Sequence, residues 1–254
     1  MQSTADGILS VLLAFGLAVL GAAISSATAV SHNALCRLIS LAAGTLLGVT
    51  LFSILPESFA AMPWLQLAAA TASGYLVFFL VSRYVFHVCP ACAASHFDEA
   101  ATHRFGEIAG AMIVALGLHS TLDGLALTLG RETEMARGLD ATLLLAICVH
   151  KVPEGLALGA LLLAAGFRRP ATVGLVAAVE ATTLLGGGIG LWAAPRMSGP
   201  WLGMLLAHVG GGFIFLALHA VFGELLQHSR AMLLVHFFAG MLLIAALRLF
   251  LALL

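Results

Sequence analysis

Two apolar segments of this chain each carry a histidine and, four residues later, a carboxylate. The first pair is His119 and Asp123, and the second is His150 and Glu154. Residues four apart lie on one face of an α-helix, about one turn from each other. If the two helices pack together, two imidazoles and two carboxylates face one point. This set of nitrogen and oxygen ligands suits zinc and its first-row neighbours.

The repetition of this pattern favours a metal site over two unrelated histidines. A single histidine in an apolar helix is more often satisfied by a hydrogen bond to a neighbouring helix. Here a histidine, an acid four residues later and a glycine directly after it occur twice, about thirty residues apart. Ionisable groups at membrane depth are costly and rarely lack a function. A divalent cation between the two pairs would offset that cost.

The composition is that of an integral membrane protein. Of the 254 residues, 61% are hydrophobic and 9% are charged, and the net charge is −1. Soluble domains are far less apolar than this. The near-neutral charge gives no indication of a nucleic-acid partner. The four cysteines do not amount to the disulfide framework of a small secreted protein.

Eight apolar runs are long enough to cross a bilayer, which takes about 20 residues for each helix. We therefore expect an all-α integral membrane protein, a bundle of eight transmembrane helices with the metal site between the fourth and the fifth. The N-terminus lacks the basic start of a signal peptide, so the first run should be retained. Residues 1–254 would form a single transmembrane domain. The expected helices are 8–30, 38–59, 64–86, 107–129, 141–166, 171–194, 201–226 and 231–254, with a polar loop at 87–106.

Arginines in the connecting loops indicate how the chain is oriented. Basic residues concentrate in the cytoplasmic loops of membrane proteins. Six arginines follow the first, third, fifth and seventh expected helices, whereas three follow the fourth and sixth. We therefore predict that both termini lie outside and that loop 87–106 is cytoplasmic. The expected location is the plasma membrane, which in a bacterium is the inner membrane.

With these features the chain resembles the ZIP (Zrt/Irt-like) family of metal-ion transporters. The resemblance rests on the eight-helix layout, the polar loop after the third helix, and two motifs. The motifs are His119-Ser120-x-x-Asp123-Gly124 and His150-Lys151-x-Pro153-Glu154-Gly155. The resemblance implies import of a divalent metal into the cytoplasm through a midplane site. The metal is cargo rather than a cofactor. It is usually zinc, with Fe²⁺, Mn²⁺ and Cd²⁺ as alternatives.

Of three positions around the second metal in family members that hold two metals, two differ in this chain and the third, Glu180, matches. Those members place Asn, an acid and Glu where this chain has Ser120, Lys151 and Glu180. At about 100° per residue, Lys151 projects about 60° beyond Glu154, on the side where a second ion would share that carboxylate. We expect a mononuclear site in which Lys151 replaces the second metal and neutralises Glu154 and Glu180. Alternatively, Lys151 pairs with Glu180 only to stabilise packing.

Other polar residues lie along the expected route or in the polar loop. Glu57 would attract cations at the outer entrance or simply cap the membrane surface. His219 and Glu224 would receive the metal on the cytoplasmic side, or His219 is a hydrogen-bonded core histidine. The loop contains a Cys-x-x-Cys pair with flanking histidines, which suits metal binding, redox chemistry or neither. Its candidate ligands are His87, Cys89, Cys92, His96 and His103.

Transport is the first functional interpretation, and the chain is not expected to be an enzyme. One helix group would rock against another around a fixed midplane site. A membrane-embedded zinc hydrolase would activate water with the same ligands, but the sequence has no H-E-x-x-H motif. A metal-sensing subunit would bind the metal without moving it. The expected partners are divalent metal ions and membrane lipid, with a homodimer as a candidate assembly.

Overall fold

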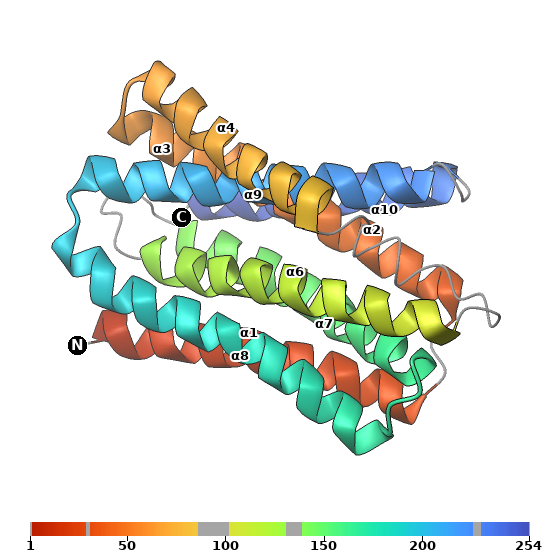
Figure 1. The fold of residues 1–254 in the computed structure, drawn as a ribbon. Helices are drawn as coiled ribbons and strands as arrows, with labels where there is room; N and C mark the ends of the chain where they lie inside the picture. Colours follow the sequence, from red (N-terminus) through yellow and green to blue (C-terminus); the bar gives the residue numbers. More distant parts are fainter. Residues whose placement is uncertain (1, 29–30, 86–101, 131–138, 226–229, 254) are drawn as a thin grey trace.

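The computed structural model describes residues 2–28, 31–85, 102–130, 139–225 and 230–253. All regular structure in these ranges is helical (Figure 1). Eight helical stretches are long and apolar enough to cross a membrane. The prediction of an all-α integral membrane protein with eight spans is therefore confirmed.

The helices differ in length and in how the spans are assembled from them. The second span is continuous through α2, a π-helical stretch at Thr50–Ile54 and α3, and another π-helical stretch, Val81–Val85, extends α4. The helices are α1 (Gln2–Ala27), α2 (His32–Val49), α3 (Leu55–Ala61), α4 (Trp64–Leu80), α6 (Thr102–Leu129), α7 (Leu139–Ala164), α8 (Arg169–Ala193), α9 (Gly199–Leu225) and α10 (Arg230–Leu253).

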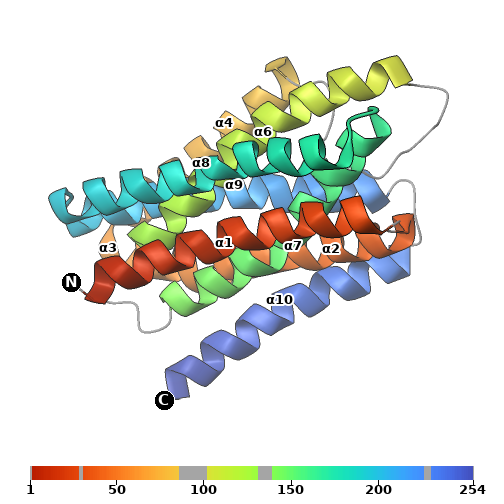
Figure 2. The same ribbon diagram turned by 90° about the horizontal axis from the view of Figure 1, so that it is seen from below.

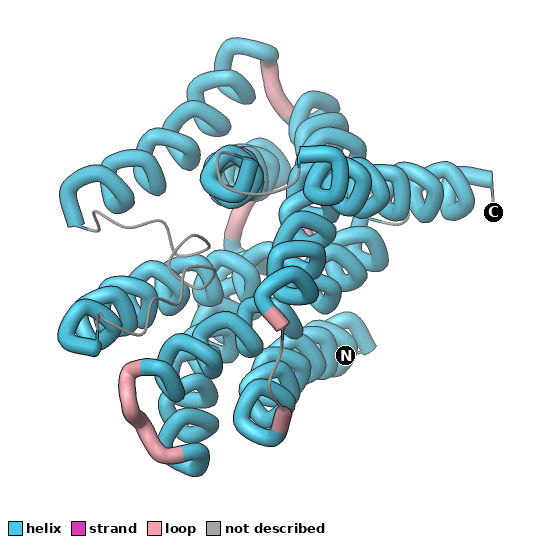
Figure 3. Tube along the Cα trace, turned by 90° about the vertical axis from the view of Figure 1, so that its right-hand side faces the viewer, coloured by secondary structure: helices cyan, strands magenta, loops and turns pink. Residues whose placement is uncertain are grey.

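The helices pack as two groups, which Figures 1 and 2 show from perpendicular directions. In the first group α1 lies along α7 and α8, and α6 lies along α8. In the second group α2 lies along α10 and α9, and α4 lies along α9. The main contact between the groups is that of α2 with α7. Both chain ends lie at the same end of the bundle, and Figure 3 looks along the packed helices.

Glycines set the close packing inside the first group. The glycines that directly follow the two motif carboxylates both face the backbone of a neighbouring helix. A Cβ on Gly124 would overlap the carbonyl oxygen of Thr183 in α8, and one on Gly155 would overlap that of Ala18 in α1. Small residues allow such close approach of helices in lipid. Each glycine thus fixes the position of the carboxylate that precedes it.

Substituting Gly155 with alanine should therefore destabilise the protein by about 1–3 kcal/mol, because backbone must move to admit the methyl group. Gly188→Ala is the matched control in α8, since a Cβ there meets nothing within 4 Å. That control should be neutral or should stabilise the helix by up to about 1 kcal/mol. Unfolding of the purified variants in detergent measures both changes. Equal stability of the two variants would contradict this packing argument.

The two halves of the bundle interior differ in how tightly they are filled. Toward the end that carries the chain termini, buried apolar side chains occupy the space between the groups, among them Val49, Ile54, Leu143 and Leu206. Toward the opposite end, a partly open cavity of about 150 Å³ remains. Among the described residues, packed apolar side chains therefore lie on one side of the bundle's middle and the cavity lies on the other.

Candidate metal centre

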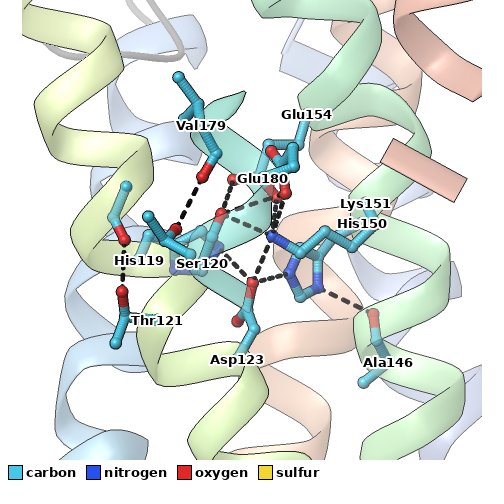
Figure 4. A network of polar contacts seen from close by, with 12 residues as sticks. His119, Ser120, Thr121, Asp123, Ala146, His150, Lys151, Glu154, Val179 and Glu180 are labelled. Atoms are coloured by element: carbon cyan, nitrogen blue, oxygen red, sulfur yellow. Dashed lines mark hydrogen bonds and ion pairs between the residues drawn. The ribbon is translucent and has the colours of Figure 1, made fainter. Parts of the chain in front are cut away.

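Four side chains meet where α6 contacts α7, and they are the four ligands that the sequence predicts. His119, Asp123, His150 and Glu154 each offer a ligand atom, and these atoms lie within 4.8 Å of one another. Nε2 of His119 and Nε2 of His150 lie 3.4 and 3.2 Å from Oδ2 of Asp123 (Figure 4). Ligand atoms around a tetrahedral zinc ion are separated by about 3.4 Å. The arrangement therefore fits one such ion after small side-chain rotations.

The backbone fixes the orientation of the His150 ring. Its Nδ1 lies 2.9 Å from the carbonyl oxygen of Ala146, one helical turn earlier. A carbonyl only accepts, so Nδ1 carries the proton and a neutral ring presents the lone pair of Nε2 to Asp123. Two acceptors 3.2 Å apart repel each other unless a proton or a metal ion lies between them. Metal-binding histidines are held in this way by a hydrogen bond at the other ring nitrogen.

Several buried polar atoms around this point have no hydrogen-bond partner among the residues that the structure describes. They include Nδ1 of His119, Oδ1 of Asp123 and Oε1 of Glu180. Buried polar atoms without partners are rare in folded proteins. Both oxygens of Asp123 are therefore candidate metal-binding atoms, because Oδ1 has no hydrogen-bond partner among the described residues and Oδ2 lies within 3.4 Å of both histidine Nε2 atoms.

Lys151 is completely buried and lies among three carboxylates. Its Nζ is 2.8 Å from each of Asp123 Oδ2, Glu154 Oε2 and Glu180 Oε2, and it donates a 2.7 Å hydrogen bond to Ser120 Oγ. The hydroxyl of Ser120 in turn lies 3.2 Å from Glu180 Oε2. The sequence suggested the pairs with Glu154 and Glu180. It did not predict the pair with Asp123, because the position of Lys151 on α7 does not show which residue of α6 packs against it.

The cavity reaches this cluster from the end of the bundle opposite the chain termini. His119, His150 and Glu154 form its inner end. Its outer part is bounded by the beginning of α2, the end of α4, the beginning of α6 and the later halves of α7 and α9. The candidate metal ligands are therefore reached by a cavity from that side.

The comparison with known protein families decides the assignment. A family model described as ZIP zinc transporter matches residues 92–248, which is more than half of the chain. The chain belongs to this family. ZIP proteins transport divalent metal ions and are not enzymes, so the hydrolase alternative is set aside. No curated protein matches the chain closely.

In this ZIP chain the charges around Lys151 favour one bound ion. Asp123, Glu154 and Glu180 carry three negative charges and Lys151 one positive charge, which leaves two formal negative charges when both imidazoles are neutral. One divalent ion balances them. A second ion would bury two uncompensated positive charges, which is strongly unfavourable in a low-dielectric interior.

Two of the remaining candidate residues have identifiable neighbours. Glu57 in α3 forms an ion pair with Arg248 of α10, so a cation beside it already offsets its charge. His219 in α9 stacks on Phe215, with ring centroids 5.0 Å apart, and it lines the cavity that leads from the metal ligands. The structure therefore places His219, but not Glu57, on the wall of the accessible side.

The other candidates cannot be placed. Glu224 lies in the last turn of α9 and His103 in the first turn of α6, and the side chains of both are outside the described structure. The remaining loop candidates lie outside the described residues altogether, and they are His87, Cys89, Cys92 and His96. The role of this loop remains a sequence prediction.

Proposed function

We propose that this chain moves one divalent metal ion at a time, with zinc as the preferred cargo, and that His119, Asp123, His150 and Glu154 are its ligands. The observation that carries this proposal is the Lys151 ammonium, which lies 2.8 Å from an oxygen of both carboxylate ligands. Each carboxylate thus has a fixed cation beside it, and one oxygen of Asp123 also lies within 3.4 Å of both histidine Nε2 atoms. Two imidazoles with two carboxylates form a ligand set suited to zinc.

The proposed direction is import into the cytoplasm. The cavity extends from the ligands toward the bundle end that carries the loops after the first, third, fifth and seventh spans. Six arginines lie in or near those loops, against three in or near the loops after the fourth and sixth spans, so we assign this end to the cytoplasm and both termini to the outside. The opposite half is filled by buried apolar side chains. On this assignment the structure is an inward-facing state.

The proposed transport step is a movement of the first helix group against the second. The four ligands and Lys151 all lie on α6 and α7, and Glu180 lies on α8, so the whole polar cluster belongs to the first group. The second group faces it with apolar side chains such as Leu46 and Phe213. The candidate ligand that this group adds to the cavity wall is His219. Displacing one group against the other would expose the same ligands to each side in turn.

Zinc flux into proteoliposomes tests this proposal. His119→Ala and Glu154→Ala should each abolish measurable uptake, because each removes a ligand from the site. Leu185→Ala is the control, since Leu185 is 59% exposed on the outside of α8, and it should transport normally. Competition with Fe²⁺, Mn²⁺ and Cd²⁺ ranks the metals. Metal binding without flux in the unmodified protein would identify a sensor instead of a transporter.

A further inference from the structure

The cavity beside the metal ligands has the size and lining of a site for a small ring. Its volume is about 150 Å³, and its walls carry Leu46, Phe78, Met112, Leu116 and Phe215 together with several alanines. An engineered apolar cavity of about 150 Å³ in another protein stays dry and binds benzene. A cavity of this volume therefore has room for a single six-membered ring.

The inner end of the cavity has a different character from its walls. Glu154 lies there together with the two histidines. Its Oε2 lies 2.8 Å from Lys151 Nζ, and its Oε1 accepts a hydrogen bond of 3.3 Å from Ser120 Oγ, which leaves the carboxylate with further acceptor capacity. The cluster behind it carries more carboxylates than ammonium groups. The cavity is thus an apolar chamber with a hydrogen-bond acceptor, the Glu154 carboxylate, and excess negative charge at its inner end.

We propose that this cavity binds small aryl cations, such as benzylammonium or benzamidinium. The ring would occupy the apolar chamber between Phe78, Leu116 and Phe215, and the cationic group would donate to the carboxylate of Glu154. Charge-assisted hydrogen bonds of this kind are about twice as strong as neutral ones. The site is distinct in its chemistry from the metal site because most of its contact area is apolar. It shares Glu154 with the metal site.

The proposal is tested by titrating metal-free protein, purified in detergent, with benzylamine and measuring binding by calorimetry. We expect saturable binding that weakens about tenfold or more in Ala115→Leu, which fills the chamber. Ala220→Leu fills it from α9 and guards against a folding defect of the first variant. Ala69→Leu, on the exposed face of α4, should bind as the unmodified protein does. Glu154→Gln should weaken benzylamine but leave the neutral analogue benzyl alcohol unaffected.

The outcomes separate this inference from the proposed transport site. Absence of saturable binding, or an affinity in both filled variants equal to that of the unmodified protein, would overturn the aryl-cation site. Zinc should displace bound benzylamine, and only this expectation rests on the proposed function. If benzylamine binds in the cavity and zinc fails to displace it, the aryl-cation site stands and the assignment of Glu154 as a metal ligand is wrong.

Discussion

Replacing Lys151 with methionine is expected to destabilise the metal-free protein by about 3–5 kcal/mol. This is the usual cost of removing one partner of a buried ion pair, because the other charge stays buried without compensation. The methionine side chain has a similar length but no charge. It would leave Asp123, Glu154 and Glu180 facing one another without the ammonium that contacts all three. Chemical or thermal unfolding in detergent, with a chelator present, measures the loss.

A divalent metal should restore much of this stability, because a second cation would then occupy the place of the ammonium. Titration of the unmodified protein should give one tightly bound equivalent, and Lys151→Asp should give two. Lys151 is the only lysine in the chain, so selective lysine labelling reports its environment as one side-chain NMR signal. Two equivalents in the unmodified protein, or no stability loss in Lys151→Met, would contradict the role of Lys151 as a fixed second cation.

The use of lysine at this position has a physical reason. Every other cation in the chain apart from histidine is an arginine. An ammonium is a compact charge with three rotatable donors, whereas a guanidinium is a planar fork that suits one carboxylate. Three carboxylates converge on one point here. Lys151→Arg is therefore not a conservative change at this position.

The sequence predicts the ligand cluster because the relevant information is local. A spacing of four residues places His119 with Asp123, and His150 with Glu154, on one helix face whatever the rest of the bundle does. The length and hydropathy of the apolar runs suffice to predict the eight spans. Both signals are read within a single helix. They are therefore independent of how the helices are arranged.

The arrangement of the helices could not be predicted in the same way. Apart from the faces of the fourth and fifth spans that carry the candidate ligands, the spans are largely apolar, so no polar face shows which of the other helices pack together. The contact of Gly155 with Ala18 depends on α1 lying along α7, which nothing near either residue indicates. The contact of Lys151 with Asp123 and the cavity between the two groups depend on the same tertiary packing.

Asp123→Asn should have the largest effect on metal binding, with at least about a 100-fold loss of affinity. Changes to groups that only support metal ligands cost about 10–100-fold, and the loss of a ligand should reach or exceed the upper end. Oδ2 of Asp123 lies within 3.4 Å of both histidine Nε2 atoms as well as 2.8 Å from Lys151 Nζ. Zinc titration of the purified variant and flux in proteoliposomes should decline together.

Glu180→Gln is the matched control for this change. It also neutralises one fully buried carboxylate that lies 2.8 Å from Lys151, so the two variants alter the charge of the cluster equally. Glu180 is not among the four side chains whose ligand atoms converge, and its loss should weaken zinc binding by no more than about tenfold. A larger effect of Glu180→Gln than of Asp123→Asn would move the bound ion away from the histidines, toward the place that we assign to the lysine ammonium.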